Sequence, residues 1–152
     1  MLIGVISDTH GLLRPEAVEA LRGSELIVHA GDVGAPEILH RLRAIAPTWA
    51  VRGNVDTQSW AQTLPVTEVV QAGHLQLYVL HDLGTLDLDP KAAGFAAVIS
   101  GHTHRASVEV RDGVLYLNPG SAGPRRFSLP VTVARLRVLH GQLSPEIVDL
   151  RI

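Results

Sequence analysis

Two histidines separated by one residue, His102 and His104, follow an apolar run and a glycine in the stretch SGHTHRA. Imidazole nitrogens are common ligands of divalent metal ions, so the pair could belong to a metal site. Two close histidines are also common in surface loops, and the metal interpretation therefore needs partners elsewhere in the chain. The chain has no cysteine, so any metal must be held by nitrogen and oxygen ligands.

Side chains of metal-binding type follow five separate apolar runs, each with the length and composition of a buried strand. The carboxyl ends of the strands of an open α/β sheet line one edge, so these side chains are expected to converge there. Each one alone is weak evidence, because Asp and Asn are also usual in turns. The argument depends on finding all of them together. The residues are Asp8, His10, Asp32, Asn54, His81, His102 and His104.

The spacing of these residues favours one cavity. In DTH and in HTH the candidate ligands are two positions apart, and in an extended segment such residues share a face. Glycines directly before three of the ligands would let another group approach closely; they are Gly31, Gly53 and Gly101. Seven donors with one shared carboxylate supply four ligands to each of two ions. Two ions about 3.5–4 Å apart form a clamp for a phosphoryl group.

Composition indicates a single folded domain and does not favour a nucleic-acid-binding or membrane protein. The 152 residues are 46% hydrophobic and 18% charged, which predicts a single domain over residues 1–152. A net charge of -2 and 4% aromatic residues give no nucleic-acid footprint. No apolar run is long enough to span a bilayer, and the start MLIGVISDTH lacks the basic region of a signal peptide. A cytoplasmic location is therefore expected.

The order of predicted elements indicates an α/β fold that becomes a β meander. The first half alternates strands (2–7, 25–30, 48–53) with helices (14–23, 35–46), which predicts parallel strands. The second half predicts two strands around a tight turn within 66–81, a short helical segment at 88–95, a strand at 96–100, and hairpins over 107–121 and 130–150. Two packed sheets with helices outside are expected.

The motifs DTH, GD, GN, a lone His and GHTH, in this order, resemble the calcineurin-like metallophosphoesterase superfamily. NPGS at 118–121 and the later PRR resemble its small branch, the YfcE-type phosphodiesterases, and the match spans Asp8 to Ser121. The resemblance implies a four-layer α/β/β/α fold, in which two packed mixed sheets are flanked by helices. It also implies hydrolysis of a small phosphoester by a hydroxide held between two divalent metal ions.

The resemblance further implies how the ligands divide. One metal would be held by Asp8, His10, Asp32 and His104, and Asp32 would bridge to a second metal completed by Asn54, His81 and His102. Family precedent favours manganese, while the mixed ligands also suit iron, zinc or nickel. A nucleotide-like substrate and a homodimer are left open by the same precedent.

Two positions depart from the family pattern. Many larger relatives carry a histidine directly after the Asn, which is taken to protonate the leaving group, and here Val55 stands there. Such acid help is worth about 10²–10⁴-fold, so substrates with good leaving groups are favoured. Asp82 follows His81 where the family often has glycine. Its carboxylate could orient His81, repel an anionic substrate or point away from the site, and the third interpretation is preferred.

Other residues have two interpretations each. Asp56 would hold a ligand histidine by its other ring nitrogen, or only stabilise its own turn. Arg105 and Arg125 are candidate phosphate-binding residues, with Arg126 as the neighbour of the second, or they are solvated surface charges. His29 lies within a strand and is expected to be buried and hydrogen-bonded. The rival function is a protein-binding scaffold like the retromer subunit of the Vps29 type, against which the complete set of seven ligands argues.

Overall fold

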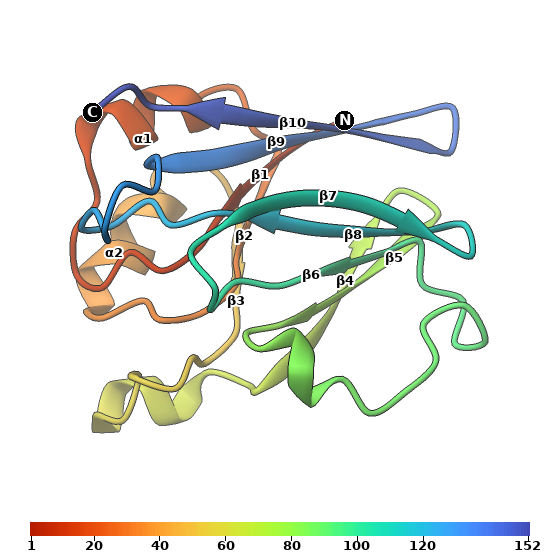
Figure 1. The fold of residues 1–152 in the computed structure, drawn as a ribbon, viewed down its shortest axis with the longest axis horizontal. Helices are drawn as coiled ribbons and strands as arrows, with labels where there is room; N and C mark the ends of the chain where they lie inside the picture. Colours follow the sequence, from red (N-terminus) through yellow and green to blue (C-terminus); the bar gives the residue numbers. More distant parts are fainter.

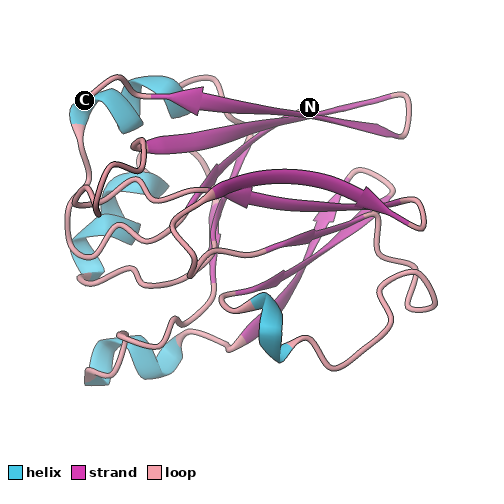
Figure 2. Cartoon of the chain, viewed as in Figure 1, coloured by secondary structure: helices cyan, strands magenta, loops and turns pink.

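Two five-stranded mixed sheets pack face to face in the computed structural model, which describes all residues 1–152 (Figures 1 and 2). The first sheet has the order β10-β9-β1-β2-β3, with bounds Gln142–Asp149, Thr132–Leu139, Leu2–Ile6, Leu26–His29 and Thr48–Ala50. The second has the order β4-β5-β6-β8-β7, with bounds Thr67–Ala72, Leu75–Leu80, Ala97–Ile99, Val114–Pro119 and Ala106–Arg111. The expected pair of packed mixed sheets is confirmed.

The first sheet contains the predicted β-α-β-α-β unit. Strands β1, β2 and β3 are parallel, and β9 and β10 extend the sheet as an antiparallel hairpin. The connecting helices α1 (Pro15–Leu21) and α2 (Pro36–Arg43) each begin with proline, whose fixed φ suits the first helical position. Helix α2 has an acidic first turn and a basic last turn, which complements the helix dipole. Both helices bury their apolar faces on the outer side of this sheet.

The second sheet pairs β5, β6 and β8 in parallel, with β4 and β7 antiparallel at its edges. Its outer face carries a small cluster around Tyr78 and Val98, covered by the chain from the 3₁₀ helix η2 (Leu83–Thr85) to Phe95. The outer layer here is thus a 3₁₀ helix and loop rather than an α-helix. The short helical segment predicted at 88–95 is wrong, because the chain there forms consecutive turns that begin at Asp89 and Pro90.

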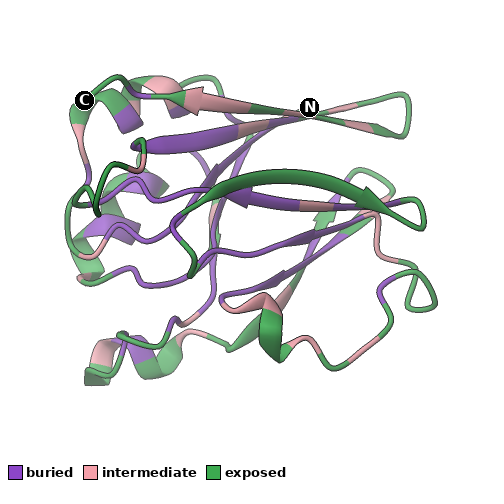
Figure 3. Ribbon diagram, in the orientation of Figure 1, coloured by how far each residue is buried: buried purple, intermediate pink, exposed green.

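The main core lies between the sheets and explains the apolar runs seen in the sequence. Sixteen buried residues from β1, β2, β4, β5, β6, β8 and β9 and from the strand ends fill it. Figure 3 shows the central strands β1, β6 and β8 as largely buried. Strands β1 and β2 are covered on both faces, by this core and by the helices, and so they carry nearly unbroken apolar sequence. No helix has the length and apolar composition needed to span a bilayer.

Candidate metal centre

The seven predicted ligands lie together at one end of the sandwich, beyond the carboxyl ends of β1, β2, β3, β5 and β6. Distances of 4.0 Å or less between donor atoms connect all seven into one cluster. In Figure 1 the loops that carry them lie on the side of the sheets away from the β7–β8 and β9–β10 turns. The sequence placed these residues at strand ends, and the fold brings those ends together.

Asp8 lies at the centre of the first group. Its Oδ1 atom is 3.3 Å from Nε2 of His104 and 3.9 Å from Nε2 of His10. This oxygen is buried and accepts no hydrogen bond. The other oxygen, Oδ2, accepts hydrogen bonds from the Ser7 hydroxyl at 2.7 Å and from the backbone N–H of His102 at 3.1 Å. One oxygen is therefore used to orient the carboxylate, and the other faces the histidines.

Asp32 lies between the first group and the second. Its Oδ2 atom is 3.2 Å from Nε2 of His81 and 3.7 Å from Nε2 of His10. Its Oδ1 atom accepts a hydrogen bond from the backbone N–H of Val55 at 3.0 Å. This carboxylate thus presents one oxygen to histidines of both proposed ligand sets.

The second group is completed by Asn54, His81 and His102. The Asn54 Oδ1 atom is 3.0 Å from Nε2 of His81 and 3.2 Å from Nδ1 of His102. The Nδ1–H of His81 donates to the carbonyl oxygen of Ala30 at 2.7 Å. In the neutral ring this bond leaves the lone pair on Nε2, the atom that faces Asp32 and Asn54.

The donor set suits divalent metal ions. Carboxylate, imidazole and amide donors are those that manganese, iron, zinc and nickel accept. The triads Asp8–His10–His104 and Asp8–Asp32–His81 each keep their ligand atoms within 4.8 Å of one another. Buried carboxylate oxygens with no hydrogen-bond partner are costly unless a cation compensates them, and Asp8 Oδ1 is such an atom.

The electrostatics of the cluster follow from its burial. Burial raises the pKa of Asp8, despite the lowering effect of the Ser7 hydrogen bond and of His81 and His104. Burial also acts to raise the pKa of Asp32, but the hydrogen bond with His81 and the Val55 N–H outweigh it and lower that pKa. The pKa of His81 is raised, because its bonds to Asp32 and Ala30 outweigh burial. The raised pKa values of Asp8 and His81 both reduce the negative charge of the cluster in the absence of a cation, whereas Asp32 keeps its charge.

Five of the seven ligands have left-handed backbone conformations. Such φ values are uncommon outside glycine and cost about 1–3 kcal/mol each when sparsely populated, and they concentrate at functional sites. The residues are Asp8 (φ 56°), His10 (47°), Asp32 (56°), His102 (72°) and His104 (64°). The prediction that DTH and HTH form extended segments is wrong, since tight left-handed turns direct both side chains into the cluster.

Close packing explains all three predicted glycines, since a Cβ atom on Gly53 would overlap the backbone nitrogen and the carboxylate of Asp32. A Cβ atom on Gly101 would overlap the Ser7 hydroxyl and the Asp8 carboxylate. A Cβ on Gly31 would lie 2.6 Å from Nδ1 of His81, inside van der Waals contact. The glycines therefore allow the loops of the two sheets to approach, as the sequence predicted.

Comparison with known proteins identifies the family. Residues 1–141 match the Calcineurin-like phosphoesterase superfamily domain. The chain belongs to this superfamily. A protein of Methanothermobacter thermautotrophicus named "Probable metallophosphoesterase" is 39% identical over 97% of this chain and 92% of its own length. The calcineurin-like phosphoesterases are metal-dependent hydrolases of phosphoesters, and the recognition made from the motifs is confirmed.

Solved structures show the same fold. A predicted phosphoesterase of Streptococcus pneumoniae superposes with a TM-score of 0.80, 23% identity and coverage of 99% of this chain and 90% of its own. Zinc-complexed Vps29 of Entamoeba histolytica gives a TM-score of 0.74, 24% identity and coverage of 99% of both chains. The phosphoesterase fold is thus shared by proteins with different names, and the fold alone does not separate the two functions expected from the sequence.

Of the two interpretations of Asp56 in this phosphoesterase, the structure agrees with the one in which it stabilises its own turn, and it adds a link to a second loop. Its Oδ2 atom accepts hydrogen bonds from the backbone N–H groups of Val33 (3.1 Å) and Gly53 (2.9 Å), and its Oδ1 atom accepts one from Gly34 (3.0 Å). It contacts no histidine ring nitrogen. The buried carboxylate instead ties the loop after Asp32 to the loop that carries Asn54.

The arginines also differ from expectation. Arg125 donates to the backbone oxygen of Ile152 at 2.9 Å and so is held at the carboxyl-terminal end of the chain. The charge of its neighbour Arg126 acts on His104, where burial and this charge lower the pKa of the imidazole against the opposing effect of Asp8. The Arg125 guanidinium is exposed and bonded to Ile152, so no contact in the structure supports the phosphate-binding role predicted for it.

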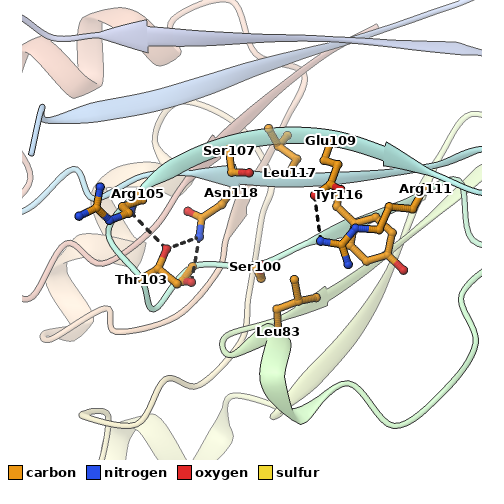
Figure 4. A pocket seen from close by; sticks show the side chains of 11 residues that line it. Leu83, Ser100, Thr103, Arg105, Ser107, Glu109, Arg111, Tyr116, Leu117 and Asn118 are labelled. Atoms are coloured by element: carbon orange, nitrogen blue, oxygen red, sulfur yellow. Dashed lines mark hydrogen bonds and ion pairs between the residues drawn. The ribbon is translucent and has the colours of Figure 1, made fainter.

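Arg105 lines a cavity of about 280 Å³ on the outer face of the second sheet, which includes none of the seven ligands. Figure 4 shows Asn118 and Thr103 at one end of this cavity and Tyr116 with Arg111 at the other, while the Arg105 guanidinium points away from it. A separate cavity, also of about 280 Å³, adjoins the cluster and is lined by Arg52, Gly53, Asn54, Val66, His81, Asp82 and Thr85. Arg52, which no sequence pattern indicated, therefore shares a cavity with two of the ligands, whereas the cavity lined by Arg105 includes none of them.

Asp82 caps the 3₁₀ helix instead of orienting His81. Its Oδ1 atom accepts a hydrogen bond from the Gly84 N–H at 2.9 Å. Its Oδ2 atom lies 4.0 Å from Nε2 of His102, and His81 is held by Ala30 instead. The first-choice interpretation, that Asp82 points away from the site, is wrong, because Asp82 lines the cavity that adjoins the cluster and its carboxylate lies beside His102.

His29 and Asn118 support the ligand loops from behind. Gly31 N–H donates to Nδ1 of the fully buried His29 at 3.1 Å, which places the proton on Nε2, 3.0 Å from the Thr9 hydroxyl. The Asn118 amide donates to the carbonyl of Gly101 at 2.9 Å and to the Thr103 hydroxyl at 3.1 Å. The sequence indicated His29 by placing a histidine inside an apolar strand, and it indicated Asn118 through the NPGS motif.

Proposed function

We propose that this phosphoesterase is a phosphodiesterase that works with two divalent metal ions, with manganese as the preferred metal. The observation that supports the proposal most is the position of Asp32 Oδ2, 3.7 Å from His10 and 3.2 Å from His81. A single oxygen that faces histidines of both groups is what a bridging ligand requires. One ion would be held by Asp8, His10, Asp32 and His104, and the other by Asp32, Asn54, His81 and His102.

When bound, two such ions activate water and neutralise charge on the phosphoryl oxygens. The chain's own residues keep the ligands rigid, since Ser7, Ala30 and Val55 each hold one ligand by a hydrogen bond. The Val55 side chain is 46% exposed and stands where a general acid would be needed. Protonation of the leaving group would then fall to water, which favours diesters with good leaving groups.

The test uses purified protein stripped with chelator and reloaded with Mn²⁺. We expect hydrolysis of bis-p-nitrophenyl phosphate, with less activity on the mono-ester, and two metal ions per chain by elemental analysis. Asp32→Ala and His102→Ala should nearly abolish activity. The matched control is His40→Ala, an exposed histidine of α2 outside the cluster.

The scaffold interpretation predicts a different result. A Vps29-like scaffold with this fold could still bind metal, so metal content alone does not decide. Wild-type protein that binds two ions but hydrolyses neither ester with any divalent metal would contradict the phosphodiesterase proposal and favour the scaffold. The circular dichroism spectra of the variants must match the wild type for the activity comparison to count.

A further inference from the structure

His102 is the most exposed of the histidine ligands, with 43% of its side-chain surface accessible. The side chains of His81 and His104 are only 6% and 4% exposed. The backbone of His102 is fixed, because its N–H donates to Asp8 Oδ2 at 3.1 Å. The imidazole has one hydrogen-bond partner in the cluster, Asn54, whose Oδ1 atom lies 3.2 Å from Nδ1. The orientation of the ring therefore depends on what its other nitrogen, Nε2, can contact.

The group that Nε2 of His102 faces is the carboxylate of Asp82, whose Oδ2 atom lies 4.0 Å away. This carboxylate is held in place, because its Oδ1 atom accepts a hydrogen bond from Gly84 N–H at 2.9 Å. The backbone of Asp82 is fixed as well, since its carbonyl accepts from the Thr85 N–H at 3.0 Å and from the Thr85 hydroxyl at 2.7 Å. One oxygen therefore anchors the carboxylate and leaves the other free to face His102.

No cationic side chain competes for the Asp82 carboxylate. Arg52 lines the same cavity, but its guanidinium donates to Gln62 Oε1 at 2.7 Å instead. Asp82 forms no ion pair with a lysine or an arginine, and its only ion-pair partner is His102. The negative charge of Asp82 therefore acts on the His102 ring without a salt bridge that would neutralise it.

The two nitrogens of His102 face different groups, and this matters for metal binding. A neutral histidine that binds a metal through one nitrogen carries its proton on the other. Because Nδ1 faces Asn54 in the cluster, that proton belongs on Nε2, the atom that faces Asp82. A carboxylate that accepts from such an N–H fixes the ring and makes the ligand nitrogen more basic. The 4.0 Å separation is about 1 Å longer than a hydrogen bond, and both side chains are exposed enough (43% and 44%) to rotate toward each other.

We propose that Asp82 is a positioning residue of the metal centre, whose carboxylate orients His102 and strengthens binding of the metal ion that His102 and Asn54 hold. In this role Asp82 touches neither the ions nor the substrate and acts through the His102 imidazole. This inference rests on the proposed function, since it takes His102 as a ligand of one of two metal ions.

Isothermal titration calorimetry of Mn²⁺ into the chelator-treated full chain tests the proposal. We expect the wild type to bind two ions, and Asp82→Asn to bind one of them about 10–100-fold more weakly with the other unchanged. An asparagine oxygen can still accept from Gly84 N–H, so a role in capping the 3₁₀ helix alone would leave both affinities unchanged. The matched control is Asp87→Asn, which removes the same charge from an exposed position that follows in the same loop.

Two further measurements distinguish an action through His102 from a general effect of charge. In a His102→Ala background, Asp82→Asn should no longer change the metal affinity, because the ring through which Asp82 acts is gone. Side-chain ¹⁵N NMR of the zinc-loaded protein should show His102 protonated at Nε2. That proton should exchange with water faster in Asp82→Asn than in the wild type.

Equal manganese affinities of the wild type and Asp82→Asn would overturn the inference, as would a wild type that binds a single ion. Unchanged metal affinities with tighter binding of inorganic phosphate to Asp82→Asn would also overturn it, and would show that the carboxylate repels anions instead. If the wild type binds two ions and hydrolyses no diester, while Asp82→Asn loses affinity for one ion, the inference stands and the proposed catalytic function fails.

Discussion

The Nε2 atoms of His10 and His104 face each other across 3.4 Å. The ring centroids are 5.3 Å apart and the planes meet at 38°, and Asp8 Oδ1 lies 3.3 Å from His104 Nε2. Two neutral imidazoles can share only one proton between such nitrogens, and the buried Asp8 oxygen has no donor. A divalent cation at this point would use both lone pairs and the carboxylate charge together.

Metal binding should therefore stabilise the fold. A ligand that binds only the folded state at a hundred times its Kd adds about 2.7 kcal/mol to the free energy of unfolding. We expect Mn²⁺ to raise the melting temperature of chelator-treated protein. His104→Ala should reduce both the shift and the metal content, since one of the two groups loses a ligand. Thermal unfolding with elemental analysis checks this.

The control for this prediction is His40→Ala, which should retain the full manganese shift because His40 is exposed on α2. A His104→Ala variant with wild-type metal content and an unchanged shift would show that this residue is no ligand.

Much of the architecture was predictable because the central strands of the first half are buried on both faces. Such strands appear in sequence as compact apolar runs, and the residues directly after each run lie at the same edge of the sheet. The Asp, Asn and His residues could therefore be assigned to one site without knowledge of any contact. The segment at 88–95 failed because a proline, two alanines and a glycine suit consecutive turns as well as a helix.

The support of the site was less predictable, since it depends on contacts between distant loops. The carboxylate of Asp56 was expected either to hold a histidine or to stabilise its own turn, and neither interpretation included the backbone N–H groups that it accepts from a loop more than twenty positions away. The left-handed φ values of the ligands could not be predicted from the presence of a histidine or an aspartate alone. Arg125 and Arg126 are adjacent and identical in type, so the sequence gives no signal that Arg125 is the one bonded to Ile152.

Asp56→Asn should weaken both the fold and the site. An amide nitrogen placed where Asp56 Oδ1 now accepts from Gly34 would bring two donors together. Bonds to a buried charged acceptor contribute about 1.5–3 kcal/mol each, so we expect a loss of about 2–3 kcal/mol in the free energy of unfolding. Activity should fall about tenfold or more, because the loops of Asp32 and Asn54 are no longer tied. Urea unfolding and diesterase assays measure the two effects.

Asp87→Asn is the matched control, because Asp87 is exposed and its side chain makes no hydrogen bond or ion pair. It should change stability by no more than about 0.5 kcal/mol. If Asp56→Asn changes the free energy of unfolding no more than this control does, the hydrogen bonds of Asp56 between the two loops do not stabilise the fold.

Gly101→Ala should damage the site more than its size suggests. The added methyl group would overlap the Ser7 hydroxyl and the Asp8 carboxylate, so the bond between them and the loop of His102 must shift. We expect destabilisation of about 1–3 kcal/mol, as for other overpacked sites, and loss of most metal binding. At Gly84 a Cβ would lie 3.2 Å from a flexible, half-exposed Asp82 oxygen, so Gly84→Ala is the milder comparison. Equal metal affinity in the two variants would rule out the close approach as a requirement.

His29 should make stability depend on pH. Burial, and then the charge of His81, lower the pKa of His29 from 6.5 to about 3. Nδ1 of the neutral ring accepts a hydrogen bond from the Gly31 N–H, so a second proton on Nδ1 would face that donor. Below pH 6.5 the histidine is protonated in the unfolded chain but stays neutral in the folded protein. The contribution of His29 to the free energy of unfolding is therefore fully present above pH 6.5 and is lost as pH falls toward 3. Between pH 7 and 5 the loss from this residue is about 2 kcal/mol.

His29→Gln isolates that contribution, because every other titrating group is shared with the wild type. Urea unfolding in chelator at pH 7, 6 and 5 should show a wild-type free energy that falls about 2 kcal/mol further than that of the variant. His40→Gln, on the exposed side of α2, should follow the wild type. Parallel curves for wild type and His29→Gln would mean that the buried ring accepts a proton within the fold. The bond to Gly31 would then not hold Nδ1 unprotonated, and the Thr9 loop would not depend on one tautomer.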